Sequence, residues 1–244
     1  MFRLETISPL AVGEEGFPRR QGRPYLPGAA LREAFLTAAL AYSVRRDEAF
    51  AAEMRRLVQH AYKGSVAGLA AEMEAALLQR QPELAALSFA DVELTGVELE
   101  PVLVCDTRRG EVARRGEVET FAGVSDTAVA LPPELETWLS AAARSYSEAL
   151  ATAESKALAS GLPASQGFYQ KLKARVLKEA PWPLRAGYWT PDPQGGRLLA
   201  LARIEAAVTA LARRFEATPL PRHVLFAPRT GASLGWLVLR REND

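Results

Sequence analysis

Arginine is the side chain in this sequence that best matches an anionic ligand. The chain has 25 arginines against five lysines, and the arginines include seven adjacent pairs. A guanidinium group binds phosphate with a planar fork of donors and stacks on nucleobases, which suits recognition of RNA. A GC-rich genome produces the same bias, and a net charge of +1 does not by itself require a nucleic-acid partner. The positions of the arginines are therefore more informative than their number.

Two glycine- and proline-containing segments place arginines beside aromatic residues. The first, residues 13–25, has three arginines together with Phe17 and Tyr25, and the second, residues 181–196, has Arg185 with three aromatic residues. Aromatic rings can stack on unpaired bases while guanidinium groups bind phosphates, a combination that suits single-stranded RNA. Trp182, which stands between two prolines, fits a packing role equally well. Both segments are expected to be surface loops.

Gly28 is expected to open a helix directly after the first of these segments. The free amides at the start of a helix can face a phosphate, and the missing side chain lets a ligand approach the backbone closely. Standing alone, Pro-Gly before a helix is usually only a turn. The candidate RNA-binding residues are Arg19, Arg20, Arg23, Gly28, Arg32, Arg108, Arg109, Arg185, Gly187 and Trp189.

Residues suited to catalysis or to metal binding are few. His60 and His223 are the two histidines, and neither has the spacing of a metal-binding motif. The adjacent Glu14 and Glu15 lie in a glycine-containing loop, where carboxylates are more often solvated than metal-bound. The sequence has no phosphate-binding GxxxxGK[ST] motif, Rossmann fingerprint or GxSxG elbow. We therefore expect no catalytic residues, no metal and no cofactor, although His223, at the start of a strand, could contact RNA.

Composition indicates a compact soluble protein of one large or two small domains. The chain has 244 residues, of which 48% are hydrophobic and 24% are charged. Cys105 is the single cysteine, so an intramolecular disulfide or a cysteine-based zinc site is excluded. The sequence has no run of about 18 apolar residues and no signal-peptide pattern. We expect a cytoplasmic protein without a membrane partner.

Alternating apolar and polar residues predict strands at both ends of the chain. Residues 2–8 alternate as in a half-buried strand, and residues 222–241 are expected to form two strands around a turn. In between, residues 91–106 and 117–129 resemble a β-hairpin with an arginine-rich connection at 108–115.

Apolar residues at three- and four-residue steps predict helices between these strands. The expected helices cover residues 28–44, two helices within 47–80, 132–153, 165–178 and 199–215. This order is typical of an α+β fold. We divide the chain into residues 1–130, with a helical insertion at about 47–80, and residues 131–244.

Four short motifs, in order along the chain, resemble those of the RAMP superfamily of CRISPR proteins. Residues 25–34, YLPGAALREA, resemble the "IPGSSLKGALR" start of the first helix in that superfamily. Residues 118–121, residues 184–189 and residues 228–239 are similar to the "vEaiPpGT" strand, the "LRiGwGsG" loop and the "lGWvkL" ending of the fifth subunit of the type III-A Csm complex. The chain lacks Pro-Gly where that subunit has "PpGT", and it has Ala29-Ala30 in place of two serines.

This resemblance implies an RRM-like (ferredoxin-like) α+β fold, with two coupled RRM-like halves. It also implies a non-catalytic subunit that binds the 3′ part of the CRISPR RNA (crRNA), caps the filament of backbone RAMP subunits and supports crRNA maturation and antiviral defence. The expected partners are crRNA and other Csm subunits, especially the backbone subunit. Two alternatives stay open, namely a crRNA-processing endoribonuclease that uses a histidine as general base and a RAMP subunit of a type III-B-like complex.

Overall fold

The computed structural model describes residues 1–12, 16–61, 65–186 and 196–241. The fold combines helices with antiparallel β-sheets, so the predicted α+β class is confirmed. Gly187 and Trp189, which the sequence indicated as RNA ligands, lie outside the described residues, as do Glu14 and Glu15.

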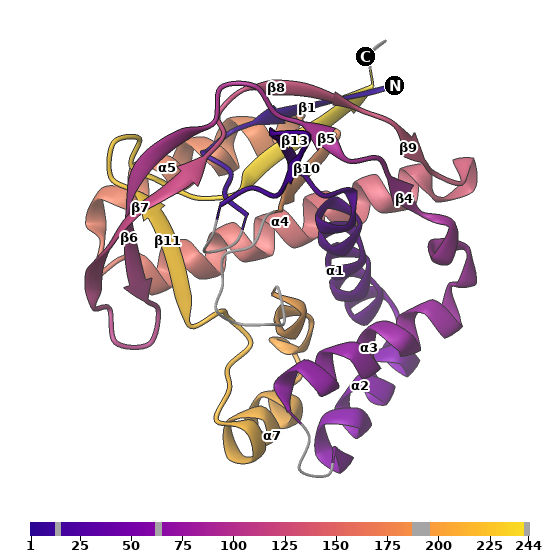
Figure 1. The fold of residues 1–244 in the computed structure, drawn as a ribbon. Helices are drawn as coiled ribbons and strands as arrows, with labels where there is room; N and C mark the ends of the chain where they lie inside the picture. Colours follow the sequence, from indigo (N-terminus) through magenta and orange to yellow (C-terminus); the bar gives the residue numbers. More distant parts are fainter. Residues whose placement is uncertain (13–15, 62–64, 187–195, 242–244) are drawn as a thin grey trace.

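The central sheet brings the two ends of the chain together. Its four strands lie in the order β10 (Trp182–Arg185), β13 (Trp236–Arg241), β1 (Phe2–Thr6) and β8 (Val124–Thr127), and all neighbours are antiparallel. The predicted first strand is confirmed, since Phe2 and Leu4 are buried while Arg3 is exposed. Phe2 is paired with Arg241, so the first and last strands lie side by side (Figure 1).

A second sheet contains a long hairpin. Its order is β12 (Ala232–Ser233), β11 (His223–Ala227), β6 (Glu98–Asp106) and β7 (Val112–Thr120). The predicted hairpin is confirmed, but the expected connection at 108–115 is too long, because β7 already begins at Val112. Arg114 and Arg115 therefore belong to a strand, and the connection is a short turn held by Asp106.

Two smaller sheets complete the β-structure of the described residues. One has the order β2 (Arg19–Arg20), β3 (Arg23–Leu26) and β5 (Val92–Glu93), and the other pairs β4 (Ser88–Phe89) with β9 (Val129–Ala130). The predicted loop at 13–25 is thus partly wrong, because it contains a β-hairpin. The two residues of its turn, Gln21 and Gly22, both have positive φ, of 52° and 81°. Such turns match the twist of paired strands and hold them together.

Helices fill the space below the central sheet and form a lobe away from it (Figure 1). α1 (Gly28–Arg46) packs against α4 (Glu136–Leu158) and the sheet, and Phe35 of α1 lies edge-on to Trp182 with ring centres 5.3 Å apart. α2, α3 and α7 form the outer lobe, so the two helices predicted within 47–80 are confirmed. The α-helices are α1 (Gly28–Arg46), α2 (Glu48–His60), α3 (Val66–Arg80), α4 (Glu136–Leu158), α5 (Gln166–Lys171), α6 (Leu177–Glu179) and α7 (Glu205–Phe215). Short helical segments of other types are η1 (Pro82–Ala86), η2 (Pro133–Leu135), η3 (Pro163–Ser165), η4 (Leu172–Val176) and η5 (Arg197–Leu201).

Three other predictions need correction. The segment 181–196 contains the strand β10, where Pro183 is tolerated because β10 lies at the edge of the central sheet. The single helix expected at 199–215 is divided into η5 and α7. The strands expected at 222–241 belong to different sheets, since β11 pairs with β6 and β13 pairs with β1.

The boundary at residue 130 stays a prediction. Each four-stranded sheet takes strands from both sides of that position, β1 and β8 with β10 and β13 in one sheet and β6 and β7 with β11 and β12 in the other.

The start of α1 generates a prediction about stability. A Cβ atom on Gly28 would lie 2.0 Å from the backbone carbonyl oxygen of Phe89, which a side chain cannot do without moving the backbone. We expect Gly28→Ala to lower the free energy of unfolding by about 1–3 kcal/mol, the usual range for overpacking. Urea unfolding measures this loss.

Gly167 provides the matched control. It lies in α5, and the position that a Cβ atom would take is open space, so Gly167→Ala should leave stability unchanged or raise it slightly. Equal stability of the two variants would show that the contact at Phe89 does not require a glycine.

Candidate nucleic-acid interface

The hairpin β2–β3, residues 19–26, carries three of the predicted arginines, and we call it the basic hairpin. Each arginine pairs with a carboxylate from a distant segment. Arg19 lies 2.5 Å from Glu119, Arg20 lies 2.7 Å from Asp91, and Arg23 lies 2.8 Å from Glu93. These ion pairs fasten the basic hairpin to β5 and β7.

Arg20 and Arg23 remain open to solvent despite their partners. Their side chains are 70% and 72% exposed, and the guanidinium of Arg20 lies 5.2 Å from the ring centre of Tyr25. Exposed ion pairs are weak, so an RNA phosphate can compete with the carboxylate for these groups. Arg19 is bound more firmly, and its hydrogen bond lowers the pKa of Glu119 below the usual value.

Gly28 does not offer a free amide as predicted. Its N–H donates to a carboxylate oxygen of Asp91 at 3.0 Å, and the other oxygen of Asp91 accepts from Arg20. An internal carboxylate thus occupies the position that the sequence assigned to a phosphate. Arg32 is half-buried and donates through Nε to the carbonyl of Leu87 at 3.0 Å, which ties α1 to the segment before β4.

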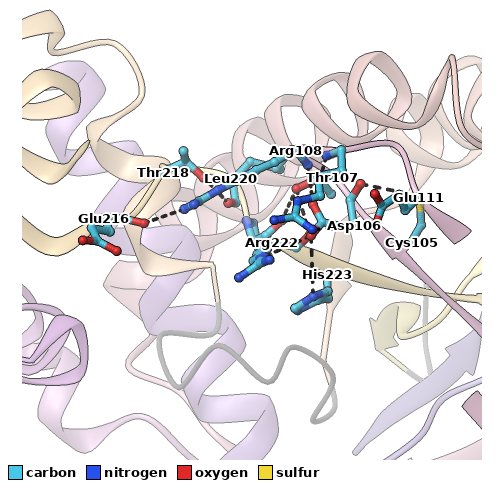
Figure 2. A network of polar contacts seen from close by, with 12 residues as sticks. Cys105, Asp106, Thr107, Arg108, Glu111, Glu216, Thr218, Leu220, Arg222 and His223 are labelled. Carbon is cyan, nitrogen blue, oxygen red and sulfur yellow. Dashed lines mark hydrogen bonds and ion pairs between the residues drawn. The ribbon is translucent and has the colours of Figure 1, made fainter. Parts of the chain in front are cut away.

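Asp106, at the end of β6, organises the predicted pair Arg108 and Arg109 (Figure 2). One carboxylate oxygen accepts the backbone N–H groups of both arginines, at 2.8 and 3.1 Å. The other oxygen lies 3.0 Å from Nε of Arg222 and 4.0 Å from Nε2 of His223. Residues far apart in the sequence are therefore gathered around one carboxylate.

These hydrogen bonds keep the Asp106 carboxylate charged. Burial alone raises its pKa, but the hydrogen bonds from the Arg108 amide, the Arg222 guanidinium and the Arg109 amide outweigh that effect and lower the pKa to about 2.

Arg185 has a different environment from the one predicted. It lies in β10, its side chain is 12% exposed, and it forms an ion pair with the fully buried Glu154 of α4. Its Nε donates to the carbonyl of Leu234 at 3.0 Å, and Tyr169 donates to the second oxygen of Glu154 at 2.9 Å. Burial lowers the pKa of Arg185 to about 10. The structure does not bring Arg185 into the group of exposed arginines.

Two of the predicted aromatic residues also belong to the interior. Trp182 is 4% exposed and packs against Phe2 and Phe35, and Phe17 is 2% exposed. Tyr25 is partly accessible beneath Arg20. Among the predicted aromatic residues that the structure describes, Tyr25 is therefore the one that remains accessible to a base.

Sequence reasoning missed the acidic residues that position the arginines, and it missed Arg222. One signal was available, because Asp before Arg-Arg-Gly between two predicted strands is typical of a turn capped by the aspartate side chain. The partners of the basic hairpin carried no local signal, since Asp91 and Glu119 lie 71 and 100 residues from the arginines that they bind.

Within the described residues, no group of three or more His, Cys, Asp or Glu side chains is placed to hold a metal ion. In those same ranges, no helix combines the length and the hydrophobicity needed to cross a bilayer.

The buried pair of Arg185 and Glu154 generates a stability prediction. Arg185→Ala leaves a buried carboxylate without its partner, so we expect a loss of about 3–5 kcal/mol in the free energy of unfolding. The double variant Arg185→Met with Glu154→Leu should lose less, because it removes both charges. Arg3→Ala, which breaks an exposed pair with Asp126, should cost less than about 1 kcal/mol. Similar losses in all three proteins, measured by urea unfolding, would contradict a special role for the buried pair.

The depressed pKa of Asp106 predicts a loss of stability in acid. Because the folded-state pKa of about 2 lies below the unfolded value of 3.8, the charged carboxylate stabilises the fold above about pH 4. This contribution is lost as the pH falls from about 4 toward 2. Unfolding midpoints measured between about pH 5 and about pH 2.5 should decline less steeply in Asp106→Asn than in the wild type. Parallel curves for both proteins would show that Asp106 does not contribute.

The chain is similar in sequence to an uncharacterised protein over nearly its whole length. No protein-family model matches the chain. An uncharacterised protein of Aquifex aeolicus (strain VF5) is 26% identical over 244 residues, which cover 98% of this chain and 99% of that protein.

Solved structures show a clearer similarity. A chain of a Csm–crRNA–target RNA ternary complex from a type III-A CRISPR-Cas system superposes with a TM-score of 0.61 at 16% identity, over 93% of this chain and 76% of that chain. Csm5 of T. onnurineus superposes with a TM-score of 0.57 at 18% identity, over 91% of this chain and 73% of that chain. The fold expected from the sequence motifs is confirmed, since this chain shares its overall fold with these Csm structures.

Proposed function

We propose that this chain is an RNA-binding, non-catalytic subunit of a type III-A CRISPR ribonucleoprotein. The observation that carries the proposal is the set of exposed, internally held arginines on a fold shared with Csm subunits. Guanidinium groups that are already oriented lose less conformational freedom when they bind phosphate. A surface of this kind suits an RNA backbone without strict sequence selection.

Within the complex, the proposed ligand is the 3′ part of the crRNA. The sequence motifs that resemble the fifth Csm subunit support this assignment, together with the structural similarity to Csm5. The chain would cap the filament of backbone RAMP subunits, with those subunits as its protein partners, and would support crRNA maturation and antiviral defence in the cytoplasm. Co-purification with the proteins encoded beside it in the genome tests these partners.

One observation favours a second candidate, the endoribonuclease. His223 lies 4.0 Å from Asp106 and close to Arg222, an arrangement in which a histidine could accept a proton next to a bound phosphate. Incubation of the purified protein with CRISPR repeat RNA separates the two candidates. A mobility shift with intact RNA supports the binding subunit, whereas RNA fragments that disappear in His223→Gln would establish the enzyme.

The basic hairpin generates the prediction for RNA binding. Arg20→Gln and Arg23→Gln each remove a charge-assisted contact of about 1 kcal/mol, so the double variant should bind single-stranded RNA about thirtyfold more weakly. Its affinity should also fall less steeply with salt, since fewer counterions are displaced from the RNA. Fluorescence anisotropy at several salt concentrations measures both effects.

Arg55→Gln with Arg56→Gln is the matched control, because this pair is exposed on α2 in the outer lobe. It removes the same charge and should change RNA affinity by less than about twofold. Equal weakening by the two double variants would mean that positive charge acts diffusely and that the basic hairpin has no special role.

A further inference from the structure

The segment between α7 and β11, residues 216–222, is joined to the turn of the β6–β7 hairpin. We propose that Arg108, Arg222 and His223 form a second subsite for the phosphate backbone of single-stranded RNA, positioned by Asp106. We call this group the Asp106 cluster. The inference rests on the proposed RNA-binding function and adds Arg222 and His223 to the residues that carry it.

The parts of the Asp106 cluster are fixed relative to one another (Figure 2). The backbone N–H of Thr107 donates to the carbonyl of Arg222 at 2.7 Å, and its hydroxyl donates to the carbonyl of Pro221 at 2.8 Å. Arg108 reaches across to the carbonyl of Glu216 through Nη2 at 2.8 Å. The turn and the segment before β11 therefore form one surface without the help of a ligand.

β-sheet pairing fixes the histidine. His223 opens β11 directly opposite Asp106 of β6, in the register that continues through Val224 and Cys105. Its position thus depends on the backbone ladder and does not require a side-chain partner. The imidazole and the Arg222 guanidinium lie beside the same carboxylate oxygen.

The exposed charge of the Asp106 cluster is positive. Asp106 is 11% exposed, whereas Arg222 is 47% exposed and His223 is 29% exposed. Arg108 and Arg109 are also exposed, and Arg109 is 4.0 Å from Glu111, a separation that permits only a weak surface pair. A ligand at this surface would therefore contact the guanidinium groups first, because the Asp106 carboxylate is largely buried beneath them.

An RNA phosphate matches these donors. A guanidinium has five N–H donors, so Arg108 and Arg222 can bind phosphate oxygens while keeping their contacts with Glu216 and Asp106. The Asp106 cluster is also continuous with Arg109, which the sequence already indicated as an RNA ligand. A carboxylate-rich protein segment could bind the same guanidinium groups, and the experiment below distinguishes such a segment from RNA.

Anisotropy of a labelled polyuridine tests the subsite in the full-length chain. Arg222→Gln and His223→Gln together should weaken binding about five- to tenfold and should reduce the salt dependence by roughly one counterion per lost phosphate contact. Arg222→Lys keeps the charge and should retain most of the affinity. Arg213→Gln, an exposed change on α7, should have no effect beyond about twofold. Melting temperatures of all variants identify any protein that has not folded, and Arg108→Gln, a change in the same subsite, then replaces Arg222→Gln in combination with His223→Gln.

The outcomes separate this inference from the proposed function. If the Arg222 and His223 variants bind polyuridine like the wild type while the Arg20 and Arg23 variants bind it more weakly, the Asp106 cluster is not a subsite but the proposed function stands. If neither set of variants weakens RNA binding, both ideas fail. Polyglutamate serves as the probe for a protein partner. Loss of polyglutamate binding in Arg222→Gln, with RNA binding unchanged, would overturn the subsite in favour of a protein-docking surface.

Discussion

The buried ion pair between Glu154 and Arg185 is the interaction on which the arrangement of helices and central sheet depends. It joins α4 to β10, and Tyr169 of α5 donates to the second oxygen of the same carboxylate. Arg185 also lies over the ring of Trp236 at 5.9 Å, which connects the pair to β13. A charge in the interior is tolerated only beside its partner, so these elements have one relative placement in which both charges are satisfied.

At the surface, carboxylates have the opposite role, because they orient arginines without burying them. Asp91 and Asp106 each bind a guanidinium group with one oxygen and backbone amides with the other. Each thus couples a charged side chain to the start of a helix or to a turn. Solvent-exposed ion pairs contribute little to stability, and a guanidinium group has enough donors to bind an anion beside its carboxylate partner.

The difference between these two environments decides which arginines remain accessible to an anionic ligand. Arg20, Arg23 and Arg222 keep large exposed fractions, whereas Arg185 has its donors directed at Glu154 and Leu234. In the sequence, all four stand within two residues of a proline or a glycine. A local motif therefore identifies a position in the fold, while the exposure of its side chain depends on what packs against it.

The α+β class, the first strand, the first helix and the long hairpin were predictable from the sequence, because periodicity and turn residues are local properties. Its motifs also indicated the RAMP fold. The tertiary structure decided the rest: that β11 and β13 enter different sheets, that the segment before α1 is a hairpin, and that Asp91 covers the amide of Gly28. The pairing of β11 and β13 and the contact of Asp91 with Gly28 join residues from about 60 to more than 200 positions apart, and no short segment encodes its distant partner. The hairpin pairs nearby residues such as Arg20 and Arg23, but the distant Asp91 and Glu119 hold it in place.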